Sequence, residues 1–223
     1  MEKGSDMGKV RIAVLVSGRG SNLQAIIDNI EKDLLSSEIA VVISDQADAY
    51  ALERARKHGI PAVTVSAKGY KDRREEYDAL LVKEMRERNI DLVCLAGFMR
   101  IITPVLLRAF PSRVLNIHPS LLPAFPGLHV QKKALKHGVK FSGCTVHFVD
   151  EGMDTGPIII QAVVPILDGD TEDSLSERIL KQEHRIYSRA IQLFAEGRLK
   201  VEGRRVLVSD GGNAGDAFLM NPQ

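Results

Sequence analysis

The stretch LNIHPSLLPAFPG, residues 115–127, combines side chains that could carry acyl-transfer chemistry with residues that restrict the backbone. Asn116 and His118 are two positions apart, so on an extended strand their side chains point to the same face. An amide N–H and an imidazole on one face are suited to stabilising and protonating an oxyanion. The prolines that follow would hold both groups in place, and we expect the Leu122–Pro123 bond to be cis. The alternative is a pair that only stiffens a loop.

A second polar segment, VDEGMDTGP at residues 149–157, places three carboxylates between two apolar runs. A carboxylate brought close to His118 would favour the charged imidazolium form of that side chain. Asp154, Asp150 and Glu151 could supply it, and the glycines between them allow the backbone to turn. The alternative interpretation is an ordinary acidic hairpin turn.

A glycine-containing turn, SGRGSN at residues 17–22, lies where a first strand passes into a helix. Such turns favour anions, because the first N–H groups of a helix are unpaired and its dipole is positive there. The dinucleotide pattern fails at Leu23, where a third glycine or an alanine is needed, and no Gly-Lys-Ser/Thr follows for a P-loop. We therefore predict a single phosphate bound by Gly20, Ser21 and Asn22. The alternative is a tight turn in which Ser21 caps the helix.

The other histidines show no zinc-binding spacing, neither H-E-x-x-H nor Cys-x-x-Cys; they are His58, His129, His137, His147 and His184. The sequence also has no G-x-S-x-G motif, which would hold the nucleophilic serine of a hydrolase. We expect no bound metal.

Strand-like and helix-like segments alternate along the chain, which predicts a parallel sheet with crossover helices. Strands are expected at 10–18, 38–45, 60–66, 90–97 and 113–118, and helices at 21–35, 47–59, 71–89 and from about 103. A strand pair at 143–149 and 156–166 and a long helix at 171–197 follow. The predicted fold is α/β, a Rossmann-like three-layer architecture with a mostly parallel central sheet and an antiparallel strand addition at its C-terminal side. His118 then ends a strand, at the sheet edge where such folds bind ligands.

Apolar periodicity identifies the faces on which two of these helices should pack. The first helix carries Leu23, Ile26, Ile27, Ile30 and Leu34 at helical spacing, and the helix at 71–89 carries Tyr77, Leu80, Leu81 and Met85.

The composition fits one domain over residues 1–223, since 223 residues with 44% hydrophobic content suffice for one sizeable core. We expect an N-terminal extension at about 1–8 and, after a short strand, a weakly ordered tail within about 204–223. A net charge of +1 suggests neither nucleic acid nor membrane as a partner. No apolar run spans a membrane, and Cys94 and Cys144 look like buried free thiols, so we expect a cytoplasmic protein.

Three sets of residues together resemble the glycinamide ribonucleotide formyltransferases, over about residues 10–202. They are VLVSGRGSNLQAI, AGFMRI with LNIHPSLLPAFPGLH, and TVHFVDEGMDTGPII. The Asn-x-His-Pro-Ser-Leu-Leu-Pro string is shared by a wider group of folate-dependent formyltransferases and hydrolases, so it indicates the chemistry. SGRGSNLQAI, which looks like the phosphate loop of that family, indicates the acceptor.

The resemblance implies formyl transfer from 10-formyltetrahydrofolate, as co-substrate, to the glycine amine of glycinamide ribonucleotide, a step of purine synthesis. Asn116, His118 and Asp154 match the catalytic trio of that family. The partners would be small molecules, and the chain a monomer or homodimer. A formyltetrahydrofolate hydrolase and a non-catalytic phosphosugar-binding module are the rival hypotheses.

The same resemblance implies the binding residues. Gly20, Ser21 and Asn22 match the phosphate loop, and Glu183 the carboxylate that contacts the ribose. For the folate, Asn116 lies at the reacting end, and Arg74, or its neighbour Arg73, matches the arginine near the glutamate tail. One wall of the pterin pocket matches Met99, Arg100, Ile101 and Ile102, and the opposing loop matches Asp150, Glu151, Gly152, Met153 and Asp154.

Overall fold

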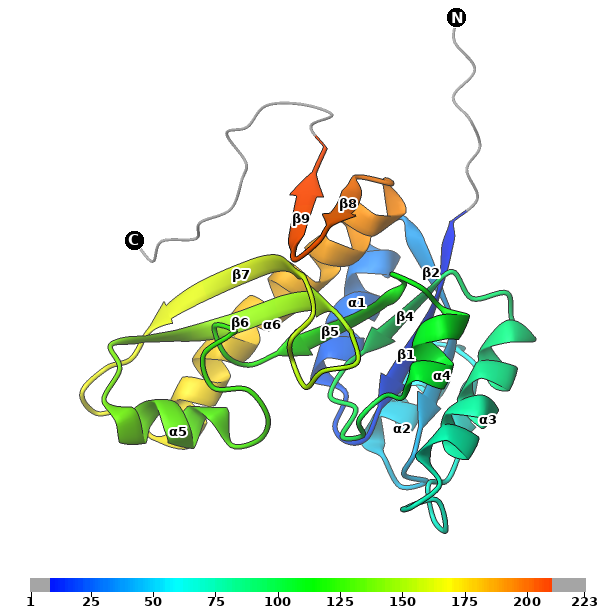
Figure 1. Cartoon of the computed structure of the whole chain (residues 1–223), viewed down its shortest axis with the longest axis horizontal. Coiled ribbons are helices and arrows are strands. Elements are labelled where there is room, and N and C mark those ends of the chain that lie inside the picture. The colour runs from blue at the N-terminus through cyan, green and yellow to red at the C-terminus, as the bar shows by residue number, and fades with distance from the viewer. Residues whose placement is uncertain (1–8, 210–223) are drawn as a thin grey trace, which may run out of the picture.

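A computed structural model describes residues 9–209, and in it nine strands form one sheet (Figure 1). The strands lie side by side in the order β3-β2-β1-β4-β5-β6-β7-β9-β8. Their bounds are β1 Val10–Val16, β2 Ser37–Ser44, β3 Ala62–Thr64, β4 Leu92–Leu95, β5 Val114–His118, β6 Phe141–Phe148, β7 Ile158–Pro165, β8 Leu199–Glu202 and β9 Arg205–Val208. The helices are α1 Ser21–Glu31, α2 Tyr50–Lys57, α3 Arg74–Arg86, α4 Pro104–Ala109, α5 Val130–His137 and α6 Glu172–Ala195.

Strands β1 to β5 are parallel, and β6 and β7 continue the sheet in antiparallel pairing. This arrangement confirms the predicted mostly parallel sheet with an antiparallel addition. Because the chain moves outward from β1 in one direction through β2 and β3 and in the other through β4 and β5, the connections diverge between β1 and β4. Ligands of open α/β sheets bind at the carboxyl ends of strands beside such a point.

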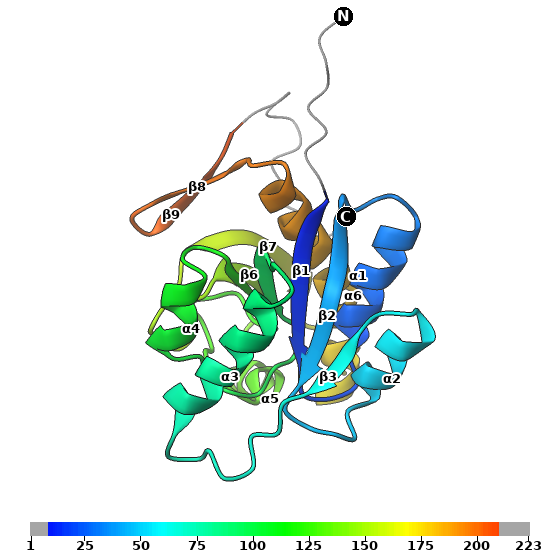
Figure 2. The same ribbon diagram turned by 90° about the vertical axis from the view of Figure 1, so that its right-hand side faces the viewer.

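Helices cover both faces of the parallel half, with α3 and α4 on one side and α1, α2 and α6 on the other (Figure 2). Successive β1 residues face opposite ways: Val14 belongs to the core cluster with α1, α2 and α6, and Leu15 to the cluster with α3 and α4. A strand buried on both faces has no reason to alternate in polarity, which explains the continuous apolar run at 10–16.

Two helix faces differ from the predicted ones. Helix α1 ends at Glu31, and Leu34, which lies beyond it, is 66% exposed, because the chain leaves the helix through Asp33 at a φ of 55°. On α3, Leu80 is 39% exposed, and Asp78 is buried instead. Burial of that carboxylate is compensated by the backbone N–H and hydroxyl of Thr103, which donate to it over 2.6 and 2.8 Å.

The pair β5–β6 has one apolar and one polar face, and this alternation positions the candidate site. Leu115 and Ile117 on β5 and Cys144, Val146 and Phe148 on β6 belong to the core cluster that also contains α6. The residues between them, Asn116, His118, Thr145 and His147, therefore share the opposite face.

The C-terminal hairpin is only partly as predicted. A short strand was expected after Gly203 and is present as β9, whereas its partner β8 was missed because Leu199–Glu202 is short and charged. Residues 1–8 and 210–223, for which an extension and a weakly ordered tail were predicted, lie outside the described residues. Cys94 and Cys144 are buried free thiols, as predicted.

Within residues 9–209, no helix has the length and apolar character needed to cross a membrane.

Candidate active site

His118 ends β5 and is held by the loop that follows it. The residue is 6% exposed, and its Nε2 atom lies 3.1 Å from the carbonyl oxygen of Phe125. The Leu122–Pro123 bond in this loop is cis, as predicted.

Side chains from the neighbouring strands fix the same loop. The Thr145 hydroxyl on β6 donates to the Ser120 carbonyl over 2.7 Å and accepts from the Leu122 backbone N–H over 3.1 Å. Gln161 on β7 donates to the Leu122 carbonyl over 2.9 Å. A loop tied by side chains at several points keeps the imidazole at its end in one orientation, which is what a catalytic group requires.

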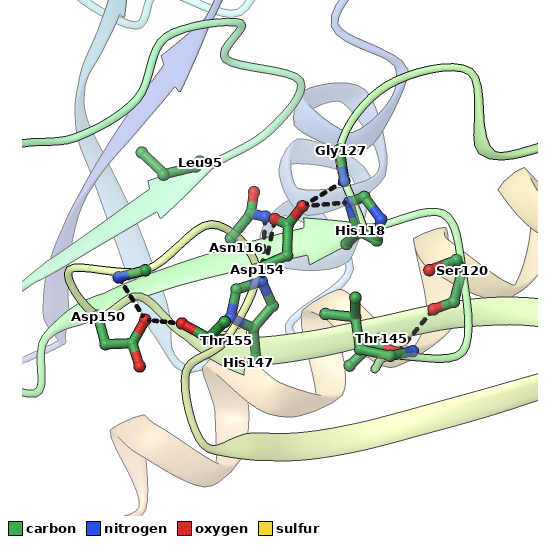
Figure 3. A network of polar contacts seen from close by, with 12 residues as sticks. Leu95, Asn116, His118, Ser120, Gly127, Thr145, His147, Asp150, Asp154 and Thr155 are labelled. Carbon is green, nitrogen blue, oxygen red and sulfur yellow. Dashed lines mark hydrogen bonds and ion pairs between the residues drawn. The ribbon is translucent and has the colours of Figure 1, made fainter. Parts of the chain in front are cut away.

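Asp154 lies beside the second ring nitrogen of His118, Nδ1 (Figure 3). One carboxylate oxygen, Oδ2, lies 3.6 Å from His118 Nδ1 and accepts a 2.8 Å hydrogen bond from the Gly127 backbone N–H. The φ of Asp154 is 55°, in the left-handed region that Asp and Asn adopt more readily than other non-glycine residues. The structure thus brings together Asn116, His118 and Asp154, which the sequence separates by up to 38 positions.

His147 also belongs to this cluster, although no motif in the sequence indicated it. Its Nε2 atom lies 3.2 Å from Asn116 Nδ2, and its Nδ1 atom lies 2.8 Å from the Phe148 carbonyl oxygen. Burial lowers the pKa of His147 below its ordinary value of 6.5. The signal that could have identified it is strand register, because Asn116 and His147 are direct cross-strand partners.

The glycine turn forms a pocket of about 230 Å³ at the carboxyl ends of β1 and β4. Gly20, at a φ of 70°, is the N-cap of α1, and Ser21 is the first helical residue, so Ser21 does not cap the helix as the structural alternative assumed. A side chain at Gly20 would approach Ala51 Cβ to 2.6 Å, which shows how closely α2 packs beneath the turn.

Asn22 and Glu183 meet behind this pocket. The Asn22 amide donates to Glu183 Oε2 over 2.7 Å, and both side chains are more than nine-tenths buried. Burial raises the pKa of Glu183, partly offset by the hydrogen bond from Asn22. Asn22 Oδ1 is buried with no hydrogen-bond partner among the described residues, whereas Asn22 itself lines the pocket and Glu183 does not. Glu183 thus lies behind Asn22 and does not itself line the pocket.

Two further pockets, of about 470 and 480 Å³, lie on either side of Arg74. Arg73 lines only the second, and its guanidinium is bonded to Glu76 and to the Gly69 carbonyl, so Arg74 is the better placed of the two for a ligand carboxylate. The first pocket is lined by Ala67, Lys68, Gly69, Lys71, Arg74, Met99, Arg100 and Ile101, and the second by 72–76, Ile101, Ile102, Thr103, Pro104 and Glu151.

Some of the predicted folate residues line these two pockets, whereas others do not, namely Asn116, Asp150, Gly152, Met153 and Asp154. Met99 lines both the glycine-turn pocket and the first of these pockets, and Glu151 connects the second to the loop that carries Asp154. Met99, Ile101 and Met153 are at least half exposed, whereas Ile102 is 6% exposed and belongs to the core cluster of α3 and α4.

Asp150 and Gly152 shape the loop that carries Asp154. Asp150 Oδ1 accepts hydrogen bonds from the Gly152 backbone N–H and the Thr155 hydroxyl, which closes a compact turn. Among the described residues, no group of three or more His, Cys, Asp or Glu side chains could hold a metal ion.

Comparison with known proteins gives three concordant matches. The model of the formyl transferase family matches residues 10–191. Phosphoribosylglycinamide formyltransferase of Escherichia coli strain K12 is 48% identical over 192 residues, which cover 86% of this chain and 90% of that protein. The crystal structure of glycinamide ribonucleotide transformylase 1 from Symbiobacterium toebii superimposes with a TM-score of 0.90 at 55% identity, covering 94% of this chain and 99% of that one.

A longer relative is also similar. The trifunctional purine biosynthetic protein adenosine-3 of Drosophila pseudoobscura pseudoobscura is 52% identical over 192 residues, which are 85% of this chain and 14% of that protein. The chain therefore spans about one seventh of the length of this relative.

Proposed function

The chain belongs to the formyl transferase family, and from that premise we propose that it transfers the formyl group of 10-formyltetrahydrofolate to the glycine amine of 5′-phosphoribosylglycinamide in purine biosynthesis. The observation that carries the proposal is the cluster of Asn116, His118 and Asp154 at the carboxyl end of β5, the same edge of the sheet as the glycine turn after β1 and the segment after β4 that lines the pockets around Arg74. Two substrates bound along this edge would meet at the cluster of donors.

The glycine turn supports a phosphate on the acceptor substrate. The first backbone N–H groups of α1, at Ser21 and Asn22, have no partner within the helix and lie at its positive end. Asn22 Oδ1 is a buried acceptor without a partner among the described residues, and a hydroxyl of a bound ribose would satisfy it. Glu183 would hold the Asn22 amide in that orientation.

The hollows beyond Met99 support a ligand with an apolar body and an acidic end, as a folate has. Exposed Met99 and Ile101 offer apolar contact, and Arg74 offers a cation. The loop at 150–154 would face the pterin, as in the family that the sequence resembles. The reacting formyl group would then lie at Asn116.

The partners of the two ring nitrogens of His118 are both acceptors, which favours the imidazolium form. A hydrogen on Nε2 donates to the Phe125 carbonyl, so a neutral ring would turn its Nδ1 lone pair toward the Asp154 carboxylate. Protonation replaces that repulsion by attraction. The separation of 3.6 Å is longer than a hydrogen bond, so the Nδ1 hydrogen is not committed to Asp154 and can be donated to a substrate oxygen.

The reaction needs no covalent enzyme intermediate. The neutral glycine amine attacks the formyl carbon, and the carbonyl oxygen becomes an anion stabilised by the Asn116 amide and the His118 imidazolium. The bond from the formyl carbon to the folate nitrogen then breaks. The amine loses one proton and the folate nitrogen gains one, a transfer that water can carry. Holding the two substrates together supplies a further part of the acceleration.

The experiment follows folate turnover spectroscopically with purified protein, 10-formyltetrahydrofolate and the nucleotide. We expect turnover only when the nucleotide is present, with one formylated nucleotide formed per folate consumed. Turnover that does not depend on the nucleotide, with release of formate, would contradict the proposal and favour the hydrolase. No turnover together with nucleotide binding would favour a non-catalytic module.

Gly20→Ala is expected to raise the KM for the nucleotide by at least about tenfold, since one hydrogen bond to a charged group contributes roughly 1.5–3 kcal/mol. The added methyl group would meet Ala51 Cβ at 2.6 Å, and the left-handed backbone of the turn would be strained. Steady-state kinetics with the nucleotide varied measure this effect.

Gly169→Ala is the matched control, because an added Cβ at Gly169 meets no atom within 4 Å and the residue has no positive φ. Its KM for the nucleotide should equal that of the unmodified protein. An unchanged KM in Gly20→Ala would place the phosphate elsewhere.

A further inference from the structure

His147 lies directly opposite Asn116 on the polar face of β5–β6, and its side chain is 2% exposed (Figure 3). Its two ring nitrogens have different partners. Nδ1 lies 2.8 Å from the Phe148 carbonyl oxygen, and Nε2 lies 3.2 Å from Asn116 Nδ2. The contact with Phe148 is buried, and the contact with Asn116 is partly buried.

The chemistry of these partners determines where the proton of His147 is. A carbonyl oxygen only accepts hydrogen bonds, so Nδ1 carries the hydrogen, and in the neutral ring Nε2 presents a lone pair. The Asn116 amide nitrogen only donates, and it meets that lone pair. Burial lowers the pKa of His147, which agrees with a neutral ring.

We propose that His147 is a positioning residue, whose Nε2 lone pair holds the Asn116 carboxamide so that its second amide hydrogen remains free for the formyl oxygen. This inference rests on the proposed function, since it assigns a use to the orientation of Asn116. Without an acceptor at this place, the amide could rotate and present its own oxygen to the developing oxyanion, which would repel it.

The groups around His147 give the proposal a pH dependence. Asp154 Oδ1 lies 3.9 Å from Nε2, and Asp150 and His118 are the other ionisable groups that act on the ring. A proton on Nε2 would replace the acceptor by a donor, which would turn toward Asp154 and repel the Asn116 amide. Because the pKa of His147 is lowered, this loss belongs to the acidic side of its ordinary value, and the neutral ring prevails at pH 7.

Two variants of His147 separate positioning from packing. His147→Leu removes the acceptor and keeps an apolar side chain of similar size, whereas His147→Gln can place an oxygen near the position of Nε2. We expect His147→Leu to lower kcat by about tenfold, less than the roughly 10²-fold loss of a donor itself. The KM for the nucleotide should stay unchanged. His147→Gln should recover most of the kcat.

A double variant tests whether His147 acts through Asn116. If it does, His147→Leu should lower kcat in the unmodified protein but add little to Asn116→Leu, because residues that act as one unit are non-additive. His58→Leu, at the C-cap of α2, removes an imidazole outside the site and should leave kcat unchanged. At acid pH the ratio of His147→Gln activity to that of the unmodified protein should rise, since glutamine does not titrate.

Three outcomes would overturn the inference: a full loss that adds to that of Asn116→Leu, no recovery in a folded His147→Gln, or a kcat in His147→Leu equal to that of the unmodified protein. Thermal unfolding of each variant identifies a merely structural loss. Formyl transfer by the unmodified protein is measured in the same series. If that transfer is absent, the proposed function fails; if it is present and any of the three outcomes occurs, only the role of His147 fails.

Discussion

In the Asp154→Asn variant, kcat for formyl transfer is expected to fall by at least about 10²-fold, a loss typical of removing one electrostatic stabiliser of an oxyanion. The KM for the nucleotide is expected to stay within about twofold of that of the unmodified protein, because the contacts that bind the nucleotide before the reaction are not changed. The side chain removed acts on His118, at 3.6 Å, and not on the glycine turn. Without the carboxylate, the imidazolium loses the charge that favours it.

Asparagine changes the charge of this side chain with little change in its shape. It retains the shape of the side chain and an oxygen that can accept from the Gly127 N–H, and it tolerates the φ of 55° as aspartate does. The change therefore isolates the negative charge. Single-turnover and steady-state rates, with each substrate varied in turn, measure the effect.

Asp168→Asn is the matched control, because the Asp168 side chain is fully exposed and forms an ion pair with Lys140 outside the site. Its kcat and KM should equal those of the unmodified protein. If the KM for the nucleotide in Asp154→Asn rose as much as kcat fell, Asp154 would be a binding residue and its assigned action on His118 would be wrong.

Asn116→Leu is expected to lower kcat by about 10²- to 10³-fold, the usual loss when one donor to an oxyanion is removed. Leucine fills similar space on the polar face of β5 but donates no hydrogen bond, so the oxyanion keeps only the His118 imidazolium. His147 would also lose its donor. Rates at saturating concentrations of both substrates give kcat, and thermal unfolding checks the fold.

Asn116→Asp distinguishes a donor from a spacer. The side chain is of almost the same shape, but an ionised carboxylate repels the oxyanion instead of stabilising it, so its kcat should be no higher than that of Asn116→Leu. A near-normal rate in either variant would mean that the amide does not touch the reacting oxygen.

The sequence predicted most of the sheet and the common face of Asn116 and His118 for a local reason, whereas Asp154 was singled out only through the resemblance. Strands buried on both faces carry long apolar runs, and Asn116 and His118 lie at a spacing of two at the end of a short apolar segment, so periodicity predicted both their position and their common face. The glycine turn was recognised in the same way, because glycines after a strand and before a helix are a local signal.

Features that depend on the pairing of distant segments were not predicted. His147 became part of the site through the register of β5 with β6, and periodicity does not specify which residues pair across strands. Ser21 was proposed as a possible cap from its type, but the helix begins at Ser21 itself, one residue earlier than a serine cap requires, and Gly20 in the left-handed conformation is the N-cap. His118 contacts the Phe125 carbonyl, and Asp154 accepts from the Gly127 N–H. Both partners are backbone atoms, so the residue types at these positions do not predict the contacts.

The number of residues in the loop at 149–157 determines where the Asp154 carboxylate lies. Strand β6 runs antiparallel to β5 and ends opposite Leu115, so the chain must return across the face of β5 to bring Asp154 to His118 (Figure 1). The loop is closely packed at its far end, where a side chain at Gly156 would lie 1.8 Å from the Phe148 carbonyl oxygen. One inserted or deleted residue in this connection would displace the carboxylate from His118 and leave β5 untouched. In a designed or diverging member of the fold, the number of residues between β6 and β7 therefore decides whether the carboxylate reaches the imidazole, even when every residue of the sheet is kept.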